Sequence, residues 1–466
     1  MFRRTIAGLA ILVVLSTLAT IAWVYHYDDR RVSRVKGGEI EKILIARGCD
    51  YCHTPGARLP FYASLPIAKQ LTERDILTGM RFFDLRPVLQ AIRQDKPVPE
   101  ADLAKIEAVV ASGEMPPALY KMMHWSGHIS DDDRLKLESW IVGQRTQFYT
   151  PPGTPASLRG SALLPLPDEL PVDPRKAALG KRLFHDLRLS ADNSESCATC
   201  HDLQNGGMDG RTTAWGVRGQ RGPINVPTVL NAAFNRTQFW DGRAKDLAEQ
   251  AGGPVQNPVE MGSSWPQVMA KLNGDDALKA TFSALYPQGL SPYALTDAIA
   301  QFEMQLITPH GPFDRYLNGD NEALTAQQKR GLTLFRQNKC GTCHTGVNLG
   351  GQSFERMGRW ADYFADRGGL THADNGRFNV THDEQDRYRF KTPTLRNVSL
   401  TGPWLHDGSA TRLSDAVRVM LKYQVGVSLT DDQVDDLVAL LQSTSGPLAP
   451  TAASEGQPEP VIPEKR

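Results

Sequence analysis

The sequence has no excess of charge and no cysteine that stands alone. Its 52 lysines and arginines balance 52 aspartates and glutamates, so bulk charge gives no reason to expect a nucleic-acid partner. Its six cysteines stand in three close pairs, which leaves none for a disulfide between distant parts of the chain. The cysteine pairs are therefore the most specific chemical feature of the sequence.

Each cysteine pair is followed at once by a histidine, in the pattern C-x-x-C-H at residues 49–53, 197–201 and 340–344. Two thiols one helical turn apart can add to the two vinyl groups of a haem, and the next histidine can reach the iron. A zinc site or a redox dithiol would use the same residue types, but three copies that consume every cysteine favour haem. The sequence predicts three c-type haems, attached through Cys49, Cys52, Cys197, Cys200, Cys340 and Cys343, with proximal iron ligands His53, His201 and His344.

The N-terminus carries an apolar run. It extends from Ile6 to Tyr25 behind Arg3 and Arg4, and 20 residues are about what a helix needs to cross a bilayer. A cleaved signal peptide is the alternative, but the run is long for a signal core and continues past the small residue Ala22. We expect a retained anchor in the bacterial inner membrane, with the N-terminus cytoplasmic and the haem domains in the periplasm, where c-type haems are attached.

The first haem motif needs a ligand on the other face of its iron. A methionine in a loop stiffened by prolines is suited to hold its thioether there, and Met115 precedes Pro116 and Pro117. We predict Met115 as this ligand, with His124 as the next candidate. The remaining alternatives are Met122, Met123 and His128.

An internal repeat surrounds the second and third haem motifs. The pattern G-x-x-L-F at 180–184 precedes the second motif and recurs at 331–335 before the third. Two related helical units therefore stand in tandem. Capping-box patterns, which mark helix starts, occur at Ser130 in the first part of the chain and at Thr430 in the last.

Together these features predict a mainly α fold, with three cytochrome-c-like haem domains in tandem behind one N-terminal transmembrane helix. The length of 466 residues agrees with about three domains. The predicted divisions are an anchor at 1–27, a first haem domain at 28–149, a Pro-rich spacer at 150–174, a second haem domain at 175–315, a third at 316–446 and a disordered tail at 447–466.

Several short motifs within about 170–446 are specific enough to indicate a family. They are Q-F-W-D-G-R at 238–243, E-Q at 249–250, N-P-V-E-M at 257–261, P-T-L-R-N at 393–397 and T-G-P-W-L-H-D-G at 401–408. This part of the chain resembles the bacterial di-haem cytochrome c peroxidases. With the anchor and the first haem domain added, the whole chain resembles the membrane-bound tri-haem subgroup, which takes electrons from quinol.

The resemblance implies a division of roles between the two repeated domains. The domain at 175–315 is the peroxidatic one, and the domain at 316–446 transfers electrons with Met420 as its distal ligand. A methionine ligand raises the haem potential, which suits an electron store. The implied catalytic residues are Glu260 as the acid–base group, Gln250 as a hydrogen-bond donor to peroxide, and Trp240 as the aromatic side chain between the two haems.

The resemblance also implies a calcium ion, held by the Asn225 side chain and by backbone oxygens of Thr401 and Pro403, because calcium prefers oxygen ligands. In one respect the chain departs from the family. Many relatives carry a histidine that caps the peroxide-binding iron at rest, whereas the loop at 215–221 has none and Val217 stands at the expected position. We therefore expect peroxide to bind without prior reduction.

These predictions describe a peroxidase that reduces hydrogen peroxide to water with electrons passed through three haems from quinol or a small redox protein. A homodimer is compatible with this interpretation. One alternative is a multi-haem electron-transfer protein, against which Glu260 and Gln250 argue. The other is a di-haem oxidase that matures a protein-derived cofactor, in which tyrosine replaces the methionine at the position of Met420.

Overall fold

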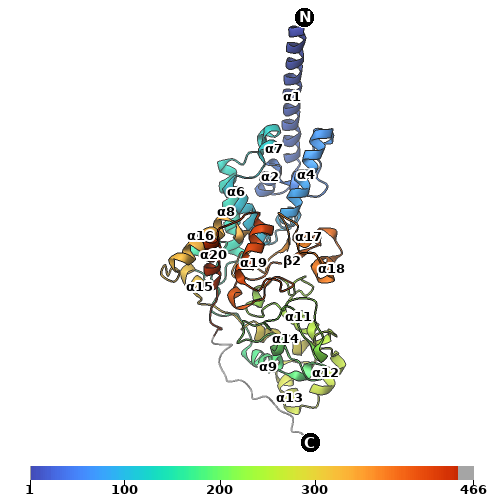
Figure 1. The fold of residues 1–466 in the computed structure, drawn as a ribbon, viewed down its shortest axis with the longest axis vertical. Helices are drawn as coiled ribbons and strands as arrows, with labels where there is room; N and C mark the ends of the chain where they lie inside the picture. Colours follow the sequence, from blue (N-terminus) through green and yellow to red (C-terminus); the bar gives the residue numbers. More distant parts are fainter. Residues whose placement is uncertain (1, 450–466) are drawn as a thin grey trace. The chain divides into compact units, whose positions relative to one another are not determined.

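The computed structural model describes residues 2–449. The chain divides into two compact units, Met1–Thr150 and Pro151–Arg466, and both are mainly helical (Figure 1). The one regular sheet in the described residues has two short antiparallel strands, β1 (Phe354–Arg356) and β2 (Arg389–Lys391). The predicted mainly α class is confirmed.

The first unit begins with a long apolar helix, α1 (Phe2–Val32). Within the described part of the chain it is the one helix that is long and apolar enough to cross a membrane. Its apolar side chains are exposed as far as Leu18, whereas Val24 and Asp28 near its end are buried in the unit. The predicted apolar helix is therefore present, and it continues without a break into the body of the unit.

The body of the first unit is a bundle of helices around a core that includes Leu85, Leu103 and Ile141. The predicted capping box forms: the Ser130 hydroxyl accepts a hydrogen bond from the Asp133 N–H at 3.1 Å, and the Asp133 carboxylate accepts one from the Ser130 N–H at 3.1 Å. The helices are α2 (Glu39–Ala46), α3 (Cys49–His53), α4 (Pro66–Phe82), α5 (Arg86–Arg93), α6 (Glu100–Ser112), α7 (Ala118–Met123) and α8 (Asp131–Phe148).

In the first half of the second unit, α9 (Pro174–Phe184) crosses α14 (Pro292–Glu303) at close range. Gly180 lies at the crossing, where a Cβ would stand 1.8 Å from the Ala298 carbonyl oxygen. Only glycine allows this approach of two helix backbones. The carboxylate of Asp173 caps α9 by accepting a hydrogen bond from the N–H of Arg175, the second residue of the helix, at 2.9 Å.

The second half repeats this arrangement. Here α16 (Ala326–Gln337) crosses α20 (Asp431–Ser443), and a Cβ at Gly331 would stand 2.0 Å from the Asp436 carbonyl oxygen. The predicted capping box at Thr430 forms. The other helices of the unit are α10 (Cys197–Cys200), α11 (Leu247–Gln256), α12 (Trp265–Leu272), α13 (Asp276–Leu285), α15 (Pro312–Leu317), α17 (Tyr363–Arg367), α18 (Phe378–Thr381) and α19 (Leu413–Met420).

The Pro-rich segment 150–174 differs from the predicted spacer. Leu163 and Leu164 are buried, and the Ala162 carbonyl accepts a hydrogen bond from the Gly346 N–H at 2.7 Å. This part of the segment is folded against the third haem motif, because leucines between the prolines bury apolar surface there. The spacer prediction is wrong for these residues.

The C-terminal segment 447–466 also differs where it is described. Ala449 is buried, and its N–H donates a hydrogen bond to the Ile307 carbonyl at 2.8 Å. The prediction of disorder is therefore wrong for 447–449. The rest of that prediction, for 450–466, lies outside the described residues.

Candidate haem centres

The three C-x-x-C-H motifs adopt similar local structures, each on a short helical turn. In each motif, Nδ1 of the histidine donates a hydrogen bond of 3.1 Å to a backbone carbonyl, and the pairs are His53 with Phe83, His201 with Gly207 and His344 with Leu349. Such a bond fixes the imidazole ring and leaves Nε2 free to bind a metal. The residues present therefore fit haem iron at all three places.

The thiols of the motifs are free of disulfides and half-buried. Burial raises the pKa of Cys49 and of Cys340 to about 12. A thiol that stays protonated is a poor nucleophile and a poor redox group. Uncharged thioether links to haem suit these surroundings better than a reactive dithiol does.

The predicted acid–base residue, Glu260, lies beside the second motif. Burial raises its pKa, and Asn257 donates a hydrogen bond from Nδ2 to its Oε1 at 2.7 Å. Burial and nearby carboxylates, among them that of Glu260, raise the pKa of the Cys200 thiol to about 12. The Val217 N–H donates to the Glu260 backbone carbonyl at 2.8 Å. The loop without histidine therefore packs directly on the segment that carries Glu260.

Helix α11 carries Gln250 close to the same place. Gln250 and Asn257 are seven residues apart, so they lie on the same side of the helical path. The Phe239 ring passes Gly253, where a Cβ would stand 3.0 Å from it, and the Arg243 guanidinium lies 3.5 Å from the centre of that ring. Gln250 therefore lies on the side of α11 that also carries Asn257, the hydrogen-bond partner of Glu260, and that the Phe239 ring borders at Gly253.

Trp240 and Met420 also come together, although 180 residues separate them in sequence. Both pack against one apolar cluster of buried side chains, Met357, Tyr363, Phe364, Phe390 and Tyr423. The Trp240 indole N–H donates to the Asn225 carbonyl at 2.9 Å, and its ring lies 6.5 Å, edge to face, from that of His406. Trp240 therefore lies where the two repeated halves meet.

The turn after Met420 is held to the third haem motif. Met420 ends α19, and a π-helical turn, η11 (Leu421–Val425), follows it. Arg359 donates from its guanidinium to the Cys343 sulfur at 3.5 Å and from its backbone N–H to the Gln424 side chain at 3.3 Å. Arg359 thus links the turn that follows Met420 to the third motif.

The residues predicted to bind calcium lie on two hydrogen-bonded segments. The Asn225 N–H donates to the His406 carbonyl at 2.8 Å, which joins Asn225 to the loop that holds Thr401 and Pro403. Asn225 is buried, and its Nδ2 donates to the Arg211 carbonyl at 2.8 Å, so Oδ1 is the atom left to face a cation. Amide and backbone oxygens of this kind fit calcium.

The candidates for the distal ligand of the first motif differ in their surroundings. His124 is buried with both ring nitrogens engaged: Nδ1 bonds to the Asp28 carboxylate at 2.6 Å and Nε2 to the Tyr62 hydroxyl. Met115 and Met122 are exposed at 39% and 65%. The side chain of Met123 lies outside the described part of the structure. His128 is exposed. Met115 stays the predicted distal ligand of the first haem.

Sequence analysis missed two buried titratable groups near these sites. Burial raises the pKa of Glu303 to about 8, and this carboxyl lies close enough to Cys197 to raise the pKa of its thiol. Burial lowers the pKa of Lys391 to about 7, and its ammonium donates to the Thr237 carbonyl at 3.0 Å. The sequence contains a signal that Glu303 is buried, because Glu303 follows Ile299 by four residues and so lies on the apolar face of α14.

The fold and these sites define a c-type cytochrome in which a half-buried carboxyl group lies beside the central haem motif. Three family models match successive parts of the chain. They are "Haem-binding domain" over residues 20–142, "Di-haem cytochrome c peroxidase" over 174–322 and "Cytochrome c" over 328–445.

Comparison with known proteins shows to which family of c-type cytochromes the chain belongs. The chain is 48% identical to cytochrome c peroxidase Ccp of Escherichia coli (strain K12) over 96% of its own length and 98% of that protein. It is 43% identical to cytochrome c551 peroxidase of Pseudomonas aeruginosa over 65% of its own length and 92% of that protein. The crystal structure of a MauG-like protein associated with microbial copper homeostasis matches 62% of this chain and 95% of that one, with a TM-score of 0.54 and 27% identity. The chain belongs to the di-haem cytochrome c peroxidase family.

Proposed function

We propose that this protein is a peroxidase, which reduces hydrogen peroxide to two waters with two electrons and two protons. The observation that carries the proposal is Glu260, a carboxyl group beside the second haem motif whose pKa burial raises. The family membership and the names of the E. coli and P. aeruginosa relatives support it.

The residues of this chain would handle the proton while the haem attached at 197–201 supplies the iron at which peroxide is reduced. A carboxyl group with a raised pKa can take a proton from one peroxide oxygen and give it to the other. The Asn257 amide orients it through the 2.7 Å hydrogen bond to Oε1. The Gln250 amide would donate a hydrogen bond that steadies the negative charge on the leaving oxygen.

The wider proposal is a chain of three c-type haems in a membrane-anchored protein of the tri-haem, quinol-oxidising subgroup. The haem with Met420 would store one electron, and Trp240, packed on the same apolar cluster, would couple it to the peroxidatic haem. The haem at 49–53 would receive electrons from quinol, with α1 in the inner membrane and the haem domains in the periplasm. Calcium at Asn225 would hold the two repeated halves together.

The test is steady-state consumption of hydrogen peroxide by the detergent-solubilised protein with all its haems attached. A reduced quinol analogue and a small reduced cytochrome are supplied in parallel as sole donors. We expect turnover with quinol to exceed turnover with the cytochrome. Turnover with the cytochrome alone would support the peroxidase activity and exclude quinol as the donor. Absence of turnover with both would overturn the proposed activity.

A further inference from the structure

A group of exposed apolar side chains surrounds α1 at the point where it enters the body of the first unit. Isolated exposed apolar residues are ordinary, but a group that gathers in one place needs an explanation. The most exposed is Ile67, at 77%. We call this group the apolar collar, and its members are Trp23, Tyr25, Phe61, Leu65, Ile67, Leu71, Leu119, Met122 and Trp125.

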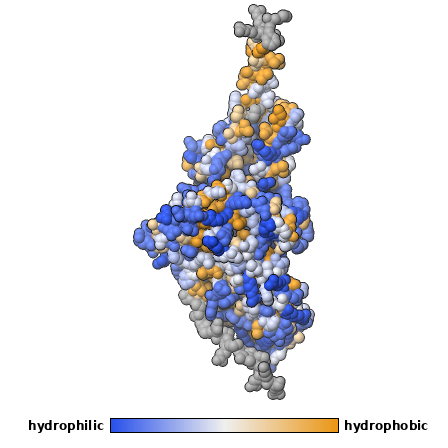
Figure 2. Space-filling view, in the orientation of Figure 1, coloured by the Kyte–Doolittle hydropathy of each residue, from blue (hydrophilic) through white to orange (hydrophobic). Residues whose placement is uncertain are grey.

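The collar comes from two segments on either side of α1 (Figure 1). One is the turn η1 (Phe61–Ser64) with the start of α4, where the Phe61 ring meets the Trp23 ring edge to face at 4.8 Å. The other is α7 with the turn η2 (Trp125–Gly127), which contacts α1. Figure 2 shows hydrophobic surface on α1 and on the neighbouring end of α4.

A buried polar link fixes these segments to α1. His124, at the end of α7, bonds through Nδ1 to the Asp28 carboxylate of α1 at 2.6 Å and through Nε2 to the hydroxyl of Tyr62 in η1. His124 is 1% exposed and Asp28 4% exposed. Because one side chain joins all three segments away from water, the collar keeps a fixed position around the helix.

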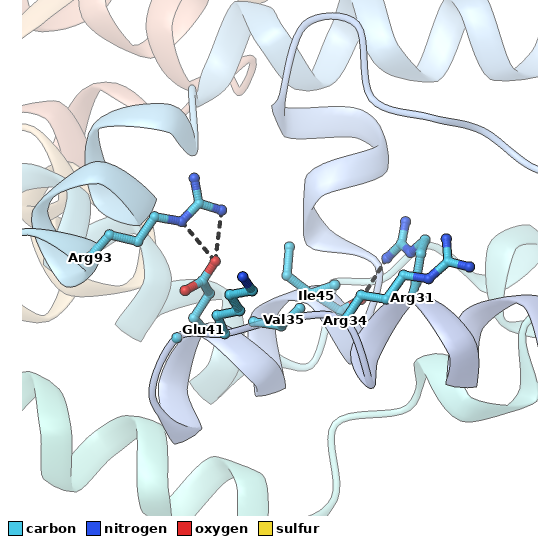
Figure 3. A pocket seen from close by; sticks show the side chains of 8 residues that line it. Arg31, Arg34, Val35, Glu41, Ile45 and Arg93 are labelled. Carbon is cyan, nitrogen blue, oxygen red and sulfur yellow. Dashed lines mark hydrogen bonds and ion pairs between the residues drawn. The ribbon is translucent and has the colours of Figure 1, made fainter.

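Basic residues lie beyond the collar, at the C-terminal end of α1 and just after it. The end of α1 and the residues after it border a pocket lined by the cations Arg31, Arg34, Lys36 and Arg93 (Figure 3). The one acidic residue of its lining, Glu41, is paired with Arg93 at 2.7 Å. Arg34 and Lys36 are exposed. Along α1 and the residues after it, the order is therefore apolar, then aromatic, then Asp28 and Asp29, of which Asp28 is buried, and then basic.

This order matches the layers of a bilayer. Apolar side chains suit the hydrocarbon, Trp and Tyr suit the boundary with the headgroups, and Lys and Arg suit the phosphates of anionic lipids. We propose that the collar is a second membrane-contacting surface, by which the first unit lies on the bilayer that α1 crosses. Its partner is the lipid itself, with the basic pocket facing anionic headgroups.

This surface would hold the first haem motif close to the membrane. α4 begins in the collar and reaches the motif at Gly79, where a Cβ would stand 2.6 Å from the Cys52 carbonyl oxygen. The distance from Pro66 to Gly79 is about 20 Å at 1.5 Å per helical residue. A donor at the surface of the bilayer would then lie about 20 Å from the haem-bearing end of the unit, with α4 spanning that distance. The membrane contact itself does not depend on the proposed donor.

The experiment uses the full-length protein with its haems, reconstituted in vesicles of phosphatidylethanolamine and phosphatidylglycerol. A nitroxide is attached at an introduced cysteine, in the Ile67→Cys variant and, as a control, in Leu77→Cys. Leu77 lies on the same helix, is 71% exposed, and stands about 15 Å farther along. We measure collisions of each nitroxide with oxygen, which concentrates in lipid, and with a nickel chelate, which stays in water.

We expect the ratio of oxygen to nickel collisions to be several-fold higher at 67 than at 77. Equal ratios would overturn the proposal. Loss of both kinds of collision at 67, with dipolar broadening of the spectrum, would show that a second copy of the chain covers the collar and would also overturn it.

The basic pocket has its own test. We expect Arg34→Gln with Lys36→Gln to retain several-fold less phosphatidylglycerol than the unmodified protein after purification in detergent, measured by lipid extraction. The matched control is Lys245→Gln with Arg336→Gln, which removes two exposed cations from the second unit and should leave retention unchanged. Equal retention of phosphatidylglycerol by both double variants would overturn the proposal that the basic pocket faces anionic headgroups.

Discussion

At the scale of single residues, the proposed chemistry depends on the carboxyl group of Glu260. Replacing it in Glu260→Gln removes the proton acceptor and should lower turnover by about 10²–10⁴-fold, as expected for a lost acid–base group. Haem content, measured by absorbance, should be unchanged. The control is Glu322→Gln, the same change at an exposed position. Near-normal turnover in Glu260→Gln would rule out this role.

Val217 supports a second prediction at this scale, because a valine cannot bind iron. It is buried against the Glu260 backbone. The Met208 sulfur, a thioether that could bind iron, instead accepts a hydrogen bond from the Gly210 N–H of its own loop at 2.9 Å. Electron paramagnetic resonance of the fully oxidised protein should show a high-spin ferric signal near neutral pH. Peroxide should perturb that signal without prior reduction. Purely low-spin signals would instead require a ligand from elsewhere.

The buried carboxyl of Glu303 supports a prediction about stability and pH. Its pKa rises from an ordinary 4.5 to about 8 in the folded protein, so the unfolded chain loses this proton first as the pH increases. The free energy of unfolding should therefore fall between these pH values, by about 1.4 kcal/mol per unit. Glu303→Gln should raise the melting temperature more at pH 8 than at pH 5. An equal change at both pH values would contradict a buried, protonated carboxyl.

At the scale of elements, each of the two repeated helix crossings depends on a glycine, which has no side chain to separate the helices. Gly331→Ala places a Cβ 2.0 Å from the Asp436 carbonyl oxygen, and overpacking of this kind costs about 1–3 kcal/mol. We expect the second unit to melt at a lower temperature in calorimetry. Gly143→Ala is the control, because Gly143 lies within α8 with nothing within 4 Å of an added Cβ. There alanine should stabilise the first unit by about 0.5–1 kcal/mol. Stabilisation by both changes would show that the crossing at Gly331 is looser than described.

At the scale of the whole molecule, the division at Thr150 allows the two units to be separated. If the first unit receives electrons from quinol, removal of residues 1–149 should abolish quinol-driven turnover and spare turnover with artificial reductants. Both activities can be followed by peroxide consumption. Quinol-driven turnover in the shortened protein would show that electrons do not have to pass through the first unit.

Several features of the molecule could be predicted from short stretches of sequence. The capping boxes at Ser130 and Thr430 form because their partners lie three residues away. The glycines at 180 and 331 marked a repeat, although their close approach to another helix appeared only in the structure. The Pro-rich segment was misjudged, because the residue that Ala162 bonds, Gly346, lies 184 residues later, and no local pattern carries that information.

By itself the sequence predicted the haem attachments and determined the apolar helix and the helix starts, because covalent chemistry and local hydrogen bonds depend on residues near in the chain. The tertiary structure alone decided that Glu260 lies beside Cys200, that Trp240 and Met420 share one apolar cluster, and that the collar surrounds α1. These are contacts between distant segments. Burial produced by such contacts sets the pKa of a carboxyl group such as Glu303, since the cost of a charge depends on what surrounds it.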